Sequence, residues 1–352
     1  IAWLDSRDKE KPFFLMCQHK APHRTFAPAL RHLNAFDGVD IPEPKSLFDD
    51  YSNRSVTLAK NEMEIDRHLR WQYDLKIRKD EMDGVKLPGI ISGSAEYRRM
   101  TSKQKKQWDA HFGPKNKEFI ADYKAGKIDH KAMVKWKYQR YIRNYLATVK
   151  AVDESVGRML SYLKDNGLDE NTIVIYSSDQ GFYLGEHGWY DKRWMFEESF
   201  KMPFIIKWPG VVEPGAKPKA LIQNIDYAST WLEMAGVEAP EEVQGESLVP
   251  ILTGKEDAVR DALYYAYYEF GEHAVPQHFG VRTQTQKLFY LPATDEWQMF
   301  DLIKDPNEMV SVYDNPEYAS ARKLLTEKYH ALREKYEAPD YEEVVVEDKK
   351  KK

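Results

Sequence analysis

Residues 172–192 read TIVIYSSDQGFYLGEHGWYDK, and this stretch decides the fold. Residues 172–176 are β-branched or apolar and are bounded by turn residues, a pattern that predicts a buried strand. Asp179 and Gln180 follow at the carboxyl end of that strand. Ligands of α/β proteins bind in the crevice beyond the carboxyl ends of the strands. We therefore expect a binding site in the loop that begins at Ser177.

Asp179 and Gln180 place a carboxylate and an amide oxygen side by side, and both are hard donors that suit Ca²⁺ or Mg²⁺. Ionisable groups are dense in the glycine-punctuated loop that follows: Glu186, His187, Asp191, Lys192 and Arg193. This density predicts a site that binds an anion and a cation together. A polar surface loop with an Asx-turn at Asp179 explains the same residues. The spacing alone leaves both interpretations open.

The composition sets broad limits on the class of protein. The chain has 352 residues, of which 42% are hydrophobic, and this suits one large α/β domain plus a smaller one. The net charge of −5 argues against a general nucleic-acid binder. No run of about 18 apolar residues occurs, so we expect no membrane span. The single cysteine, Cys17, cannot form an intrachain disulfide.

The apolar run FFLMCQ at 13–18 predicts a second buried strand, with Cys17 as a small core residue. A proline-containing turn follows this run and presents Lys20 and His23. A lysine and a histidine at such a position can hold an anion and protonate a leaving group. Two solvated loop residues are the alternative interpretation.

Hydrophobic period, caps and turn residues predict the remaining elements. Helices are expected at 101–112, 114–125, 129–164, 226–235 and 317–336, and strands at 203–208, 263–268, 279–283, 287–291 and 298–302. Residues 34–60 read as an irregular loop, and residues 61–80 are helix-prone but weakly patterned. The predicted organisation is a main domain at 1–260 with a rim insertion at about 34–128, an antiparallel subdomain at 261–340 and a disordered charged tail at 341–352.

Four motifs resemble the formylglycine-dependent sulfatases of the alkaline phosphatase superfamily. They are PFFLMCQHKAPHRTFAP at 12–28, NYLATVKAVDESVGRMLSYL at 144–163, TIVIYSSDQGFYLGEHGWYDKRWMFEESFKMPFIIKWPG at 172–210 and MFDLIKDPNE at 299–308. The resemblance covers nearly the whole chain and is greatest to enzymes that act on sulfated carbohydrates, including N-acetylglucosamine-6-sulfatases. It implies an α/β fold, an alkaline-phosphatase-like mixed sheet flanked by helices, with a smaller C-terminal antiparallel sheet plus helix.

The resemblance also implies roles for individual residues. Asp179 and Gln180 match a pair that binds an active-site Ca²⁺, with Mg²⁺ less expected. Lys192 matches a lysine that contacts the sulfate, and His23 matches a histidine near the ester oxygen that can protonate the departing sugar. Lys20, His187 and Arg193 lie in the matching motifs as substrate-binding candidates. The expected partner is a sulfated carbohydrate.

One departure from the family matters. The family's nucleophile is a cysteine in a Cys-x-Pro/Ala-x-Arg motif that is oxidised to formylglycine, whereas Cys17 is followed by QHKA. The family's N-terminal pair of aspartates is not matched either, because Asp49 and Asp50 follow a proline-rich loop. We therefore expect the chain to be the C-terminal two-thirds of a sulfatase, inactive by itself, with its formylglycine upstream of residue 1. The resemblance implies a periplasmic or secreted location, and the oligomeric state is not indicated.

Two alternatives stay open at this point. The first is a phosphodiesterase or phosphonate hydrolase of the same superfamily, although the GEHGWYDK loop with its lysine favours sulfate. The second is a non-catalytic carbohydrate-binding protein that has lost the nucleophile. His278 and Arg282 flank a predicted strand and are candidates for substrate contact, but ordinary surface residues are the favoured interpretation.

Overall fold

The computed structural model describes residues 1–93, 95–269, 272–339 and 341. The chain divides into two compact units. Unit 1 comprises residues 1–49, 63–172 and 183–191, and unit 2 comprises residues 50–62, 173–182 and 192 onward.

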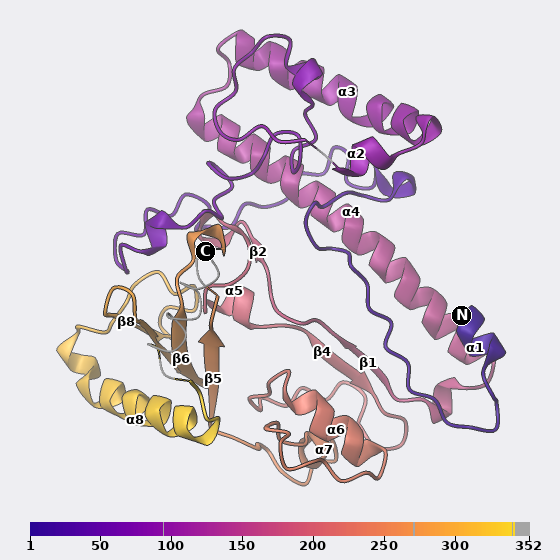
Figure 1. Ribbon diagram of the computed structural model, residues 1–352, viewed down its shortest axis with the longest axis vertical. Coiled ribbons are helices and arrows are strands. Elements are labelled where there is room, and N and C mark those ends of the chain that lie inside the picture. Colours follow the sequence, from indigo (N-terminus) through magenta and orange to yellow (C-terminus); the bar gives the residue numbers. More distant parts are fainter. Residues whose placement is uncertain (94, 270–271, 340, 342–352) are drawn as a thin grey trace. The chain divides into compact units, whose positions relative to one another are not determined.

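Unit 1 is mainly helical (Figure 1). Its elements are α1 (Ala2–Ser6), η1 (Leu30–His32), η3 (Lys79–Met82), α2 (Ala95–Arg99), α3 (Ser102–Lys124), α4 (His130–Asp165), η4 (Asp169–Asn171), β2 (Tyr183–Leu184), η5 (Glu186–Gly188) and β3 (Tyr190–Asp191), where η denotes a 3-10 helix. Unit 2 contains η2 (Leu58–Lys60), β1 (Val174–Ser177), α5 (Glu197–Phe200), β4 (Phe204–Lys207), α6 (Asp226–Met234), α7 (Val249–Leu252), β5 (Ala262–Tyr267), η6 (Glu272–Ala274), β6 (His278–Thr283), β7 (Gln286–Leu291), β8 (Glu296–Asp301), η7 (Pro316–Tyr318) and α8 (Ala319–Lys335).

The long helix α4 confirms the helix predicted at 129–164. The carboxylate of Asp129 accepts a hydrogen bond from the N–H of Ala132 at 2.7 Å and so caps the helix. The first half of α4 buries side chains such as Tyr141, whereas Leu160 near its end is exposed. The short helix α1 lies beside this end of α4 (Figure 1), where the hydroxyl of Tyr162 donates to Asp5 at 2.8 Å.

The capping box predicted at Thr101 is present: its N–H donates to the Gln104 side chain at 2.8 Å, and its hydroxyl accepts from the Gln104 N–H at 3.3 Å. The predicted break between residues 112 and 114 is wrong, since α3 continues through Pro114. An internal proline costs about 3 kcal/mol. Buried aromatic residues on both sides of it, such as Phe112 and Phe119, offset that cost.

The helix-prone reading of 61–80 is wrong for most of that range, because no helix forms before η3 begins at Lys79. Apolar side chains there are completely buried at irregular spacing: Met63, Ile65, Leu69, Trp71, Leu75 and Ile77. Their backbone groups bond to distant segments. The N–H of Ile65 donates to Gly188 at 2.9 Å, and that of Trp71 donates to Ile90 at 3.0 Å. Tertiary packing therefore overrides the local helix preference here.

The predicted buried strand at 13–18 is also wrong. These residues form no strand, Phe14 is 65% exposed, and Cys17 is exposed instead of lying in a core. Among the described residues no strand pairs with this segment, so nothing covers its apolar side chains. An apolar run becomes a buried strand only where a partner strand and a covering layer are present.

The strands predicted at 172–176 and 203–208 are confirmed as β1 and β4, which pair antiparallel from Val174 opposite Lys207 to Ser177 opposite Phe204. Their predicted full burial is wrong, because Ile205 is 64% exposed. Successive side chains of a strand point to opposite faces, and one face of this two-stranded sheet stays open among the described residues.

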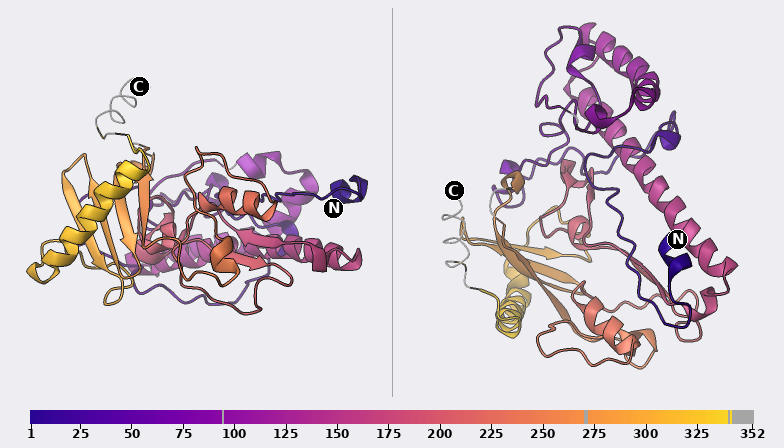
Figure 2. Two further views of the ribbon diagram at one scale, coloured as in Figure 1. Left: turned by 90° about the horizontal axis from the view of Figure 1, so that it is seen from below. Right: turned by 45° about the vertical axis from the view of Figure 1, so that its right-hand side comes forward.

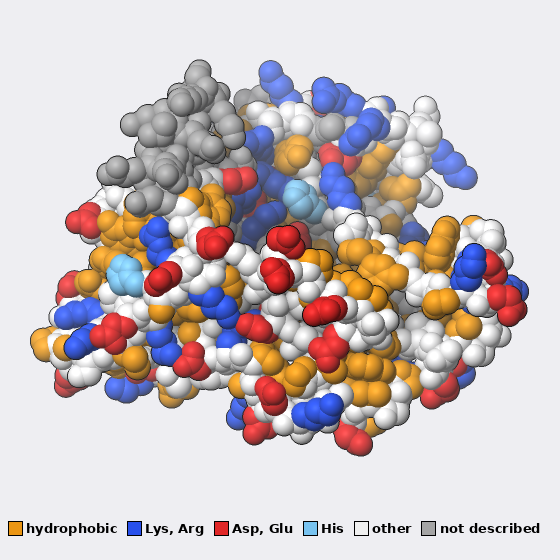
Figure 3. Space-filling model, turned by 60° about the horizontal axis from the view of Figure 1, so that its bottom comes forward, with side chains coloured by type: hydrophobic (Ala, Val, Ile, Leu, Met, Phe, Trp, Pro, Cys, Tyr) orange, Lys and Arg blue, Asp and Glu red, His pale blue; other side chains and the backbone are white. Residues whose placement is uncertain are grey.

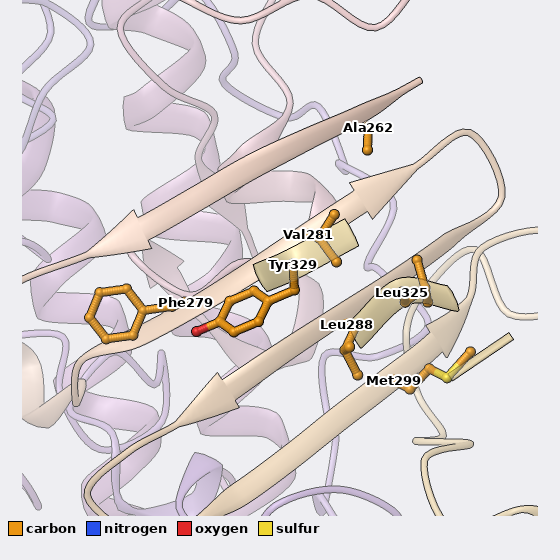
Figure 4. Packing of buried hydrophobic residues seen from close by; sticks show 7 residues of the cluster. All are labelled: Ala262, Phe279, Val281, Leu288, Met299, Leu325 and Tyr329. Atoms are coloured by element: carbon orange, nitrogen blue, oxygen red, sulfur yellow. The ribbon is translucent and has the colours of Figure 1, made fainter. Parts of the chain in front are cut away.

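The predicted C-terminal sheet is confirmed. Its four antiparallel strands run in the order β5-β6-β7-β8, and α8 crosses one face (Figure 2). Side chains from the sheet and the helix form one apolar cluster (Figure 4): Ala262, Phe279, Val281, Leu288, Met299, Leu325 and Tyr329. Earlier in unit 2, α6 confirms the helix predicted at 226–235. The predicted disordered tail lies outside the described residues from position 342 onward.

The surface carries charges of both signs. On the face seen in Figure 3, acidic and basic side chains alternate with hydrophobic ones, as the small net charge suggests. Within the described ranges, no helix combines the length and the hydropathy needed to cross a bilayer.

Candidate active site

The loop after β1 holds the predicted metal ligands Asp179 and Gln180, both in unit 2. Asp179 is exposed, and its Oδ1 accepts hydrogen bonds from the Ser178 hydroxyl at 3.2 Å and from the Gln180 N–H at 3.1 Å. Gly181 follows and donates its N–H to Ser199 at 2.9 Å. A Cβ on Gly181 would lie 2.1 Å from the carbonyl oxygen of Glu198, so only glycine lets the loop pack this closely.

The side chains of Asp179 and Gln180 are of the chemical kinds that bind a hard cation. A carboxylate and an amide oxygen are donors that Ca²⁺ accepts, but Ca²⁺ takes about six to eight oxygens. Among the described residues, no group of three or more His, Cys, Asp and Glu side chains is arranged to hold a metal. Asp179 and Gln180 could therefore supply part of a ligand set.

Lys192 and Arg193 follow β3 and belong to unit 2. Lys192 is half-buried, and its Nζ lies 5.9 Å from the centre of the Phe182 ring. The backbone of Arg193 has a positive φ of 115°, which is unfavourable for a residue with a side chain. Two hydrogen bonds hold it: its N–H donates to Ser199 Oγ at 2.9 Å, and its carbonyl accepts from the Tyr265 hydroxyl at 2.6 Å. The backbone beside Lys192 is thus fixed by its surroundings.

Lys20 and His23 share one turn in unit 1, and both side chains are exposed. The N–H of His23 donates to the carbonyl of Lys20 at 2.9 Å and closes the turn. The imidazole Nδ1 lies 2.9 Å from the carbonyl oxygen of Arg24. A carbonyl can only accept, so Nδ1 carries the hydrogen in this bond. In the neutral ring, Nε2 then holds the lone pair.

His187, also in unit 1, is completely buried. Its Nδ1 lies 3.1 Å from Oδ2 of Asp49, its N–H donates to Ser46 Oγ at 3.0 Å, and its ring packs against Tyr183 and Trp189. This enclosure favours a role in holding the loop between β2 and β3. Its predicted contact with substrate stays a prediction.

The interpretation of His278 as a surface residue is wrong. The imidazole is completely buried, stacks on Trp194 at 5.0 Å, and has its Nδ1 2.9 Å from the Pro276 carbonyl oxygen. Burial lowers the pKa of His278 to about 4. Arg282 binds Glu197 at 3.0 Å, so it is engaged in an ion pair within unit 2.

Sequence reasoning missed a buried ionic network in unit 2. The Nζ of Lys287 lies 3.0 Å from Glu197 and 2.7 Å from Glu308. Burial alone would raise the pKa of Glu197, but Lys287 and Arg282 outweigh it and lower that pKa to about 2. One sequence feature could have indicated this network: Lys287 is a charged residue at the start of the strand predicted at 287–291.

The seven candidates thus fall in two groups: Lys20, His23 and His187 lie in unit 1, and Asp179, Gln180, Lys192 and Arg193 lie in unit 2. Within unit 2, the loops that hold Asp179 and Lys192 both bond to α5, through Gly181 and Arg193 to Ser199. The assembly of all seven into one site stays a prediction.

Comparisons with known proteins supply independent information. Residues 1–237 match the family model described as "Sulfatase", and residues 185–335 match "N-sulphoglucosamine sulphohydrolase, C-terminal". The chain is 44% identical over 354 aligned positions to the N-acetylglucosamine-6-O-sulfatase of Bacteroides thetaiotaomicron, with 98% of this chain and 62% of that protein covered. It is 26% identical to the arylsulfatase of Clostridium perfringens, with 96% of this chain and 57% of that protein covered.

A solved structure gives the corresponding likeness in three dimensions. The structure of BT4656 in complex with its substrate D-glucosamine-2-N,6-O-disulfate matches with a TM-score of 0.88 at 42% identity, covering 96% of this chain and 68% of that chain. The chain spans about three-fifths of the length of the curated relatives it matches.

Proposed function

The chain belongs to the sulfatase family, and from this premise we propose that it hydrolyses the sulfate ester of a carbohydrate. Its fold is the alkaline-phosphatase-like mixed α/β fold of that family, with the C-terminal antiparallel sheet and helix described above. The observation that carries the proposal is the 44% identity to an N-acetylglucosamine-6-O-sulfatase along 98% of this chain.

The first substrate candidate is a glucosamine derivative with a 6-O-sulfate, as found in glycosaminoglycans. Support comes from the relative named for that activity and from the BT4656 complex with a 2-N,6-O-disulfated glucosamine. A sulfated sugar is polar and anionic, so its recognition needs cations and hydrogen-bond donors. Lys20, Lys192 and Arg193 are the cationic candidates in the motifs.

Lys192 is proposed to bind the sulfate. As the ester S–O bond lengthens, negative charge grows on the oxygen atoms, and a preorganised ammonium stabilises that charge. Its half-buried position and the fixed backbone of Arg193 support such preorganisation. His23 is proposed to protonate the departing sugar oxygen from Nε2, in the form of the ring that carries a hydrogen on both nitrogens; its exposed position and the bond that fixes Nδ1 support this role.

Asp179 and Gln180 are proposed as two ligands of a calcium ion. A bound ion would supply positive charge opposite the sulfate. The family also implies a formylglycine nucleophile, and its sequence motif does not occur in this sequence, where the single Cys17 is followed by QHKA. The proposal therefore assigns to these residues the binding of sulfate, the binding of calcium and the protonation of the leaving group.

A periplasmic or extracellular location is also part of the proposal, since sulfated glycans are found outside the cytoplasm. Fractionation of the source cells followed by immunoblotting would test it.

The experiment that tests the proposed function uses the purified product of the complete gene. Sulfate release is measured from 6-sulfated N-acetylglucosamine, with phosphate monoesters and phosphonate esters as controls. Calcium-dependent release from the sulfated sugar supports the proposal. Preferential hydrolysis of phosphonate or phosphate esters would move the assignment to the other branch of the superfamily. Binding of the sugar without hydrolysis would indicate a non-catalytic homologue.

A further inference from the structure

Arg24, the residue after His23, forms a buried ion pair with Asp74. The proposed function gives this pair no role. The guanidinium of Arg24 donates twice to Asp74, from Nε at 2.8 Å and from Nη2 at 2.5 Å. The Arg24 side chain is 11% exposed and the Asp74 side chain is completely buried. The guanidinium also lies over the rings of Tyr73 and Tyr190, at 5.3 and 4.9 Å. Such a bidentate pair fixes direction as well as distance.

Asp74 is itself held in place. Its Oδ2 accepts a hydrogen bond from the backbone N–H of Arg70 at 2.9 Å. The carboxylate therefore has one anchor on its own segment and one on Arg24, fifty positions away in sequence. A buried carboxylate with several donors has little freedom to move.

The next two residues of the same loop are anchored independently. The Nζ of Lys76, which is buried, donates to the carbonyl of Thr25 at 2.6 Å and to that of Tyr73 at 2.7 Å. Phe26 is completely buried and packs edge-on against Tyr141 at 5.0 Å. Residues 24–26 are thus fixed one after another by an ion pair, a charge-assisted hydrogen bond and an aromatic contact.

The carbonyl that accepts from His23 Nδ1 is the carbonyl of Arg24. Whatever fixes Arg24 therefore fixes both the orientation of the His23 ring and the nitrogen that carries its hydrogen. With Nδ1–H bonded to a carbonyl, Nε2 is the nitrogen that exchanges a proton with a ligand. The neutral histidine side chain in water prefers the opposite tautomer, so the bond to the Arg24 carbonyl is a bias that the protein supplies.

We propose that Arg24 and Asp74 are positioning residues for His23, and that their buried ion pair holds the loop from which His23 protonates the leaving group. The inference rests on the proposed function, because it needs a leaving group that requires a proton. In the step, the ester S–O bond breaks and its electron pair stays on the sugar oxygen. The donating form of His23 is the imidazolium, with hydrogens on both nitrogens: its Nε2 proton passes to the sugar oxygen, and the neutral Nδ1–H tautomer remains. The sulfuryl group passes to an oxygen nucleophile, with water as the co-reactant overall.

A positioning role can be separated from a merely structural role by the choice of substrate. A sugar alkoxide is a poor leaving group and needs the proton, whereas the anion of 4-nitrophenol leaves without one. Loss of proton delivery therefore slows the sugar sulfate selectively. A general loss of folded protein slows both substrates by the same factor.

The experiment compares Arg24→Lys and Asp74→Asn with the parent, all expressed from the complete gene, on 6-sulfated N-acetylglucosamine and on 4-nitrophenyl sulfate. We expect kcat for the sugar sulfate to fall roughly 10- to 100-fold, with KM little changed. On the aryl sulfate we expect a change below about threefold. The matched control is Arg78→Lys, since Arg78 pairs with Asp109 at 2.7 Å and ties different segments of the same unit. It should behave as the parent on both substrates.

Equal losses on the two substrates, or no loss on either, would overturn the proposal. A parent protein that hydrolyses neither substrate would refute the proposed function instead, and a second measurement still tests the positioning claim. Nitrogen-15 NMR of the histidine rings, with His23 assigned through a His23→Gln variant, should show the Nδ1–H tautomer in the parent and a mixture of tautomers in Asp74→Asn. An Nε2–H tautomer in the parent, or identical spectra in both proteins, would contradict the proposal.

Discussion

The ammonium group of Lys287 lies 2.7 Å from the carboxylate of Glu308, and both side chains are completely buried. The same ammonium lies 3.0 Å from Glu197, whose N–H at the start of α5 donates to Glu308 Oε2 at 2.7 Å. Burial raises the pKa of Glu308, because a carboxylate in an apolar interior loses its hydration. The arrangement links strand β7 to α5, which packs beside the loop of the proposed metal ligands.

Replacing Lys287 with methionine should destabilise unit 2, because the buried Glu308 would lose its cation and Glu197 would keep only Arg282. Breaking a buried pair in this way costs about 3–5 kcal/mol. Urea-induced unfolding followed by tryptophan fluorescence would measure the loss. The double variant Lys287→Met/Glu308→Gln should recover part of it, since one uncompensated charge is then removed. A single variant as stable as the parent would contradict the assigned network.

The stability of unit 2 should depend on pH through His278. Its pKa is lowered to about 4 by burial, against 6.5 in the unfolded chain, so the unfolded state binds more protons between these values. Stability is therefore fully present above pH 6.5 and falls as the pH drops towards 4, by up to about 3 kcal/mol from this group. The variant His278→Phe keeps an aromatic ring against Trp194 and should lose this part of the pH dependence. The free energy of unfolding of both proteins is measured by urea denaturation at each pH. If it fell equally with pH for the variant and the parent between pH 4 and 6.5, the lowered pKa of His278 would be refuted.

Lys192→Ala should lower kcat on a sulfated sugar by roughly 10²- to 10³-fold, as expected when a preorganised group facing transition-state charge is removed. The control is Lys217→Ala, because Lys217 is an exposed lysine of the same unit. Steady-state kinetics on the product of the complete gene gives kcat for each variant, and circular dichroism checks that each variant is folded. If both lysine variants kept the parent's kcat, Lys192 would not contact the sulfate.

Asp179→Ala should weaken calcium binding by more than roughly tenfold, because a direct ligand matters at least as much as the outer-shell partners of a metal site. Isothermal titration of the metal-stripped protein with calcium alone provides a readout that does not depend on turnover. Asp257→Ala, at an exposed aspartate in the same unit, is the control and should titrate as the parent does. Identical affinities for all three proteins would remove Asp179 from the metal site.

The sequence predicted most reliably those elements whose signal is local. The period of residues 129–164 and the cap at Asp129 located α4, and alternation with turn residues located the four strands of the C-terminal sheet. Local patterns failed where burial depends on distant partners. The apolar run at 13–18 has no pairing strand among the described residues, and the apolar side chains of residues 61–78 are buried without helical period.

The candidate site shows the same division. The motif at 172–210 predicts roles for Asp179, Gln180 and Lys192, which are close in sequence, and these roles stay predictions. The pair of Arg24 and Asp74 joins positions fifty residues apart, and no local pattern marks it. The enclosure of His187 against Asp49 was hidden for the same reason.

The central claim is that the protein is a hydrolase of sulfated carbohydrates, and the most direct test is a comparison of two kcat/KM values. The product of the complete gene is assayed with 6-sulfated N-acetylglucosamine and with a phosphonate monoester, each with and without calcium. We expect kcat/KM to be far higher for the sulfated sugar, and we expect chelation of calcium to abolish this activity. A higher kcat/KM for the phosphonate ester, or no hydrolysis of the sulfated sugar in the presence of calcium, would contradict the central claim.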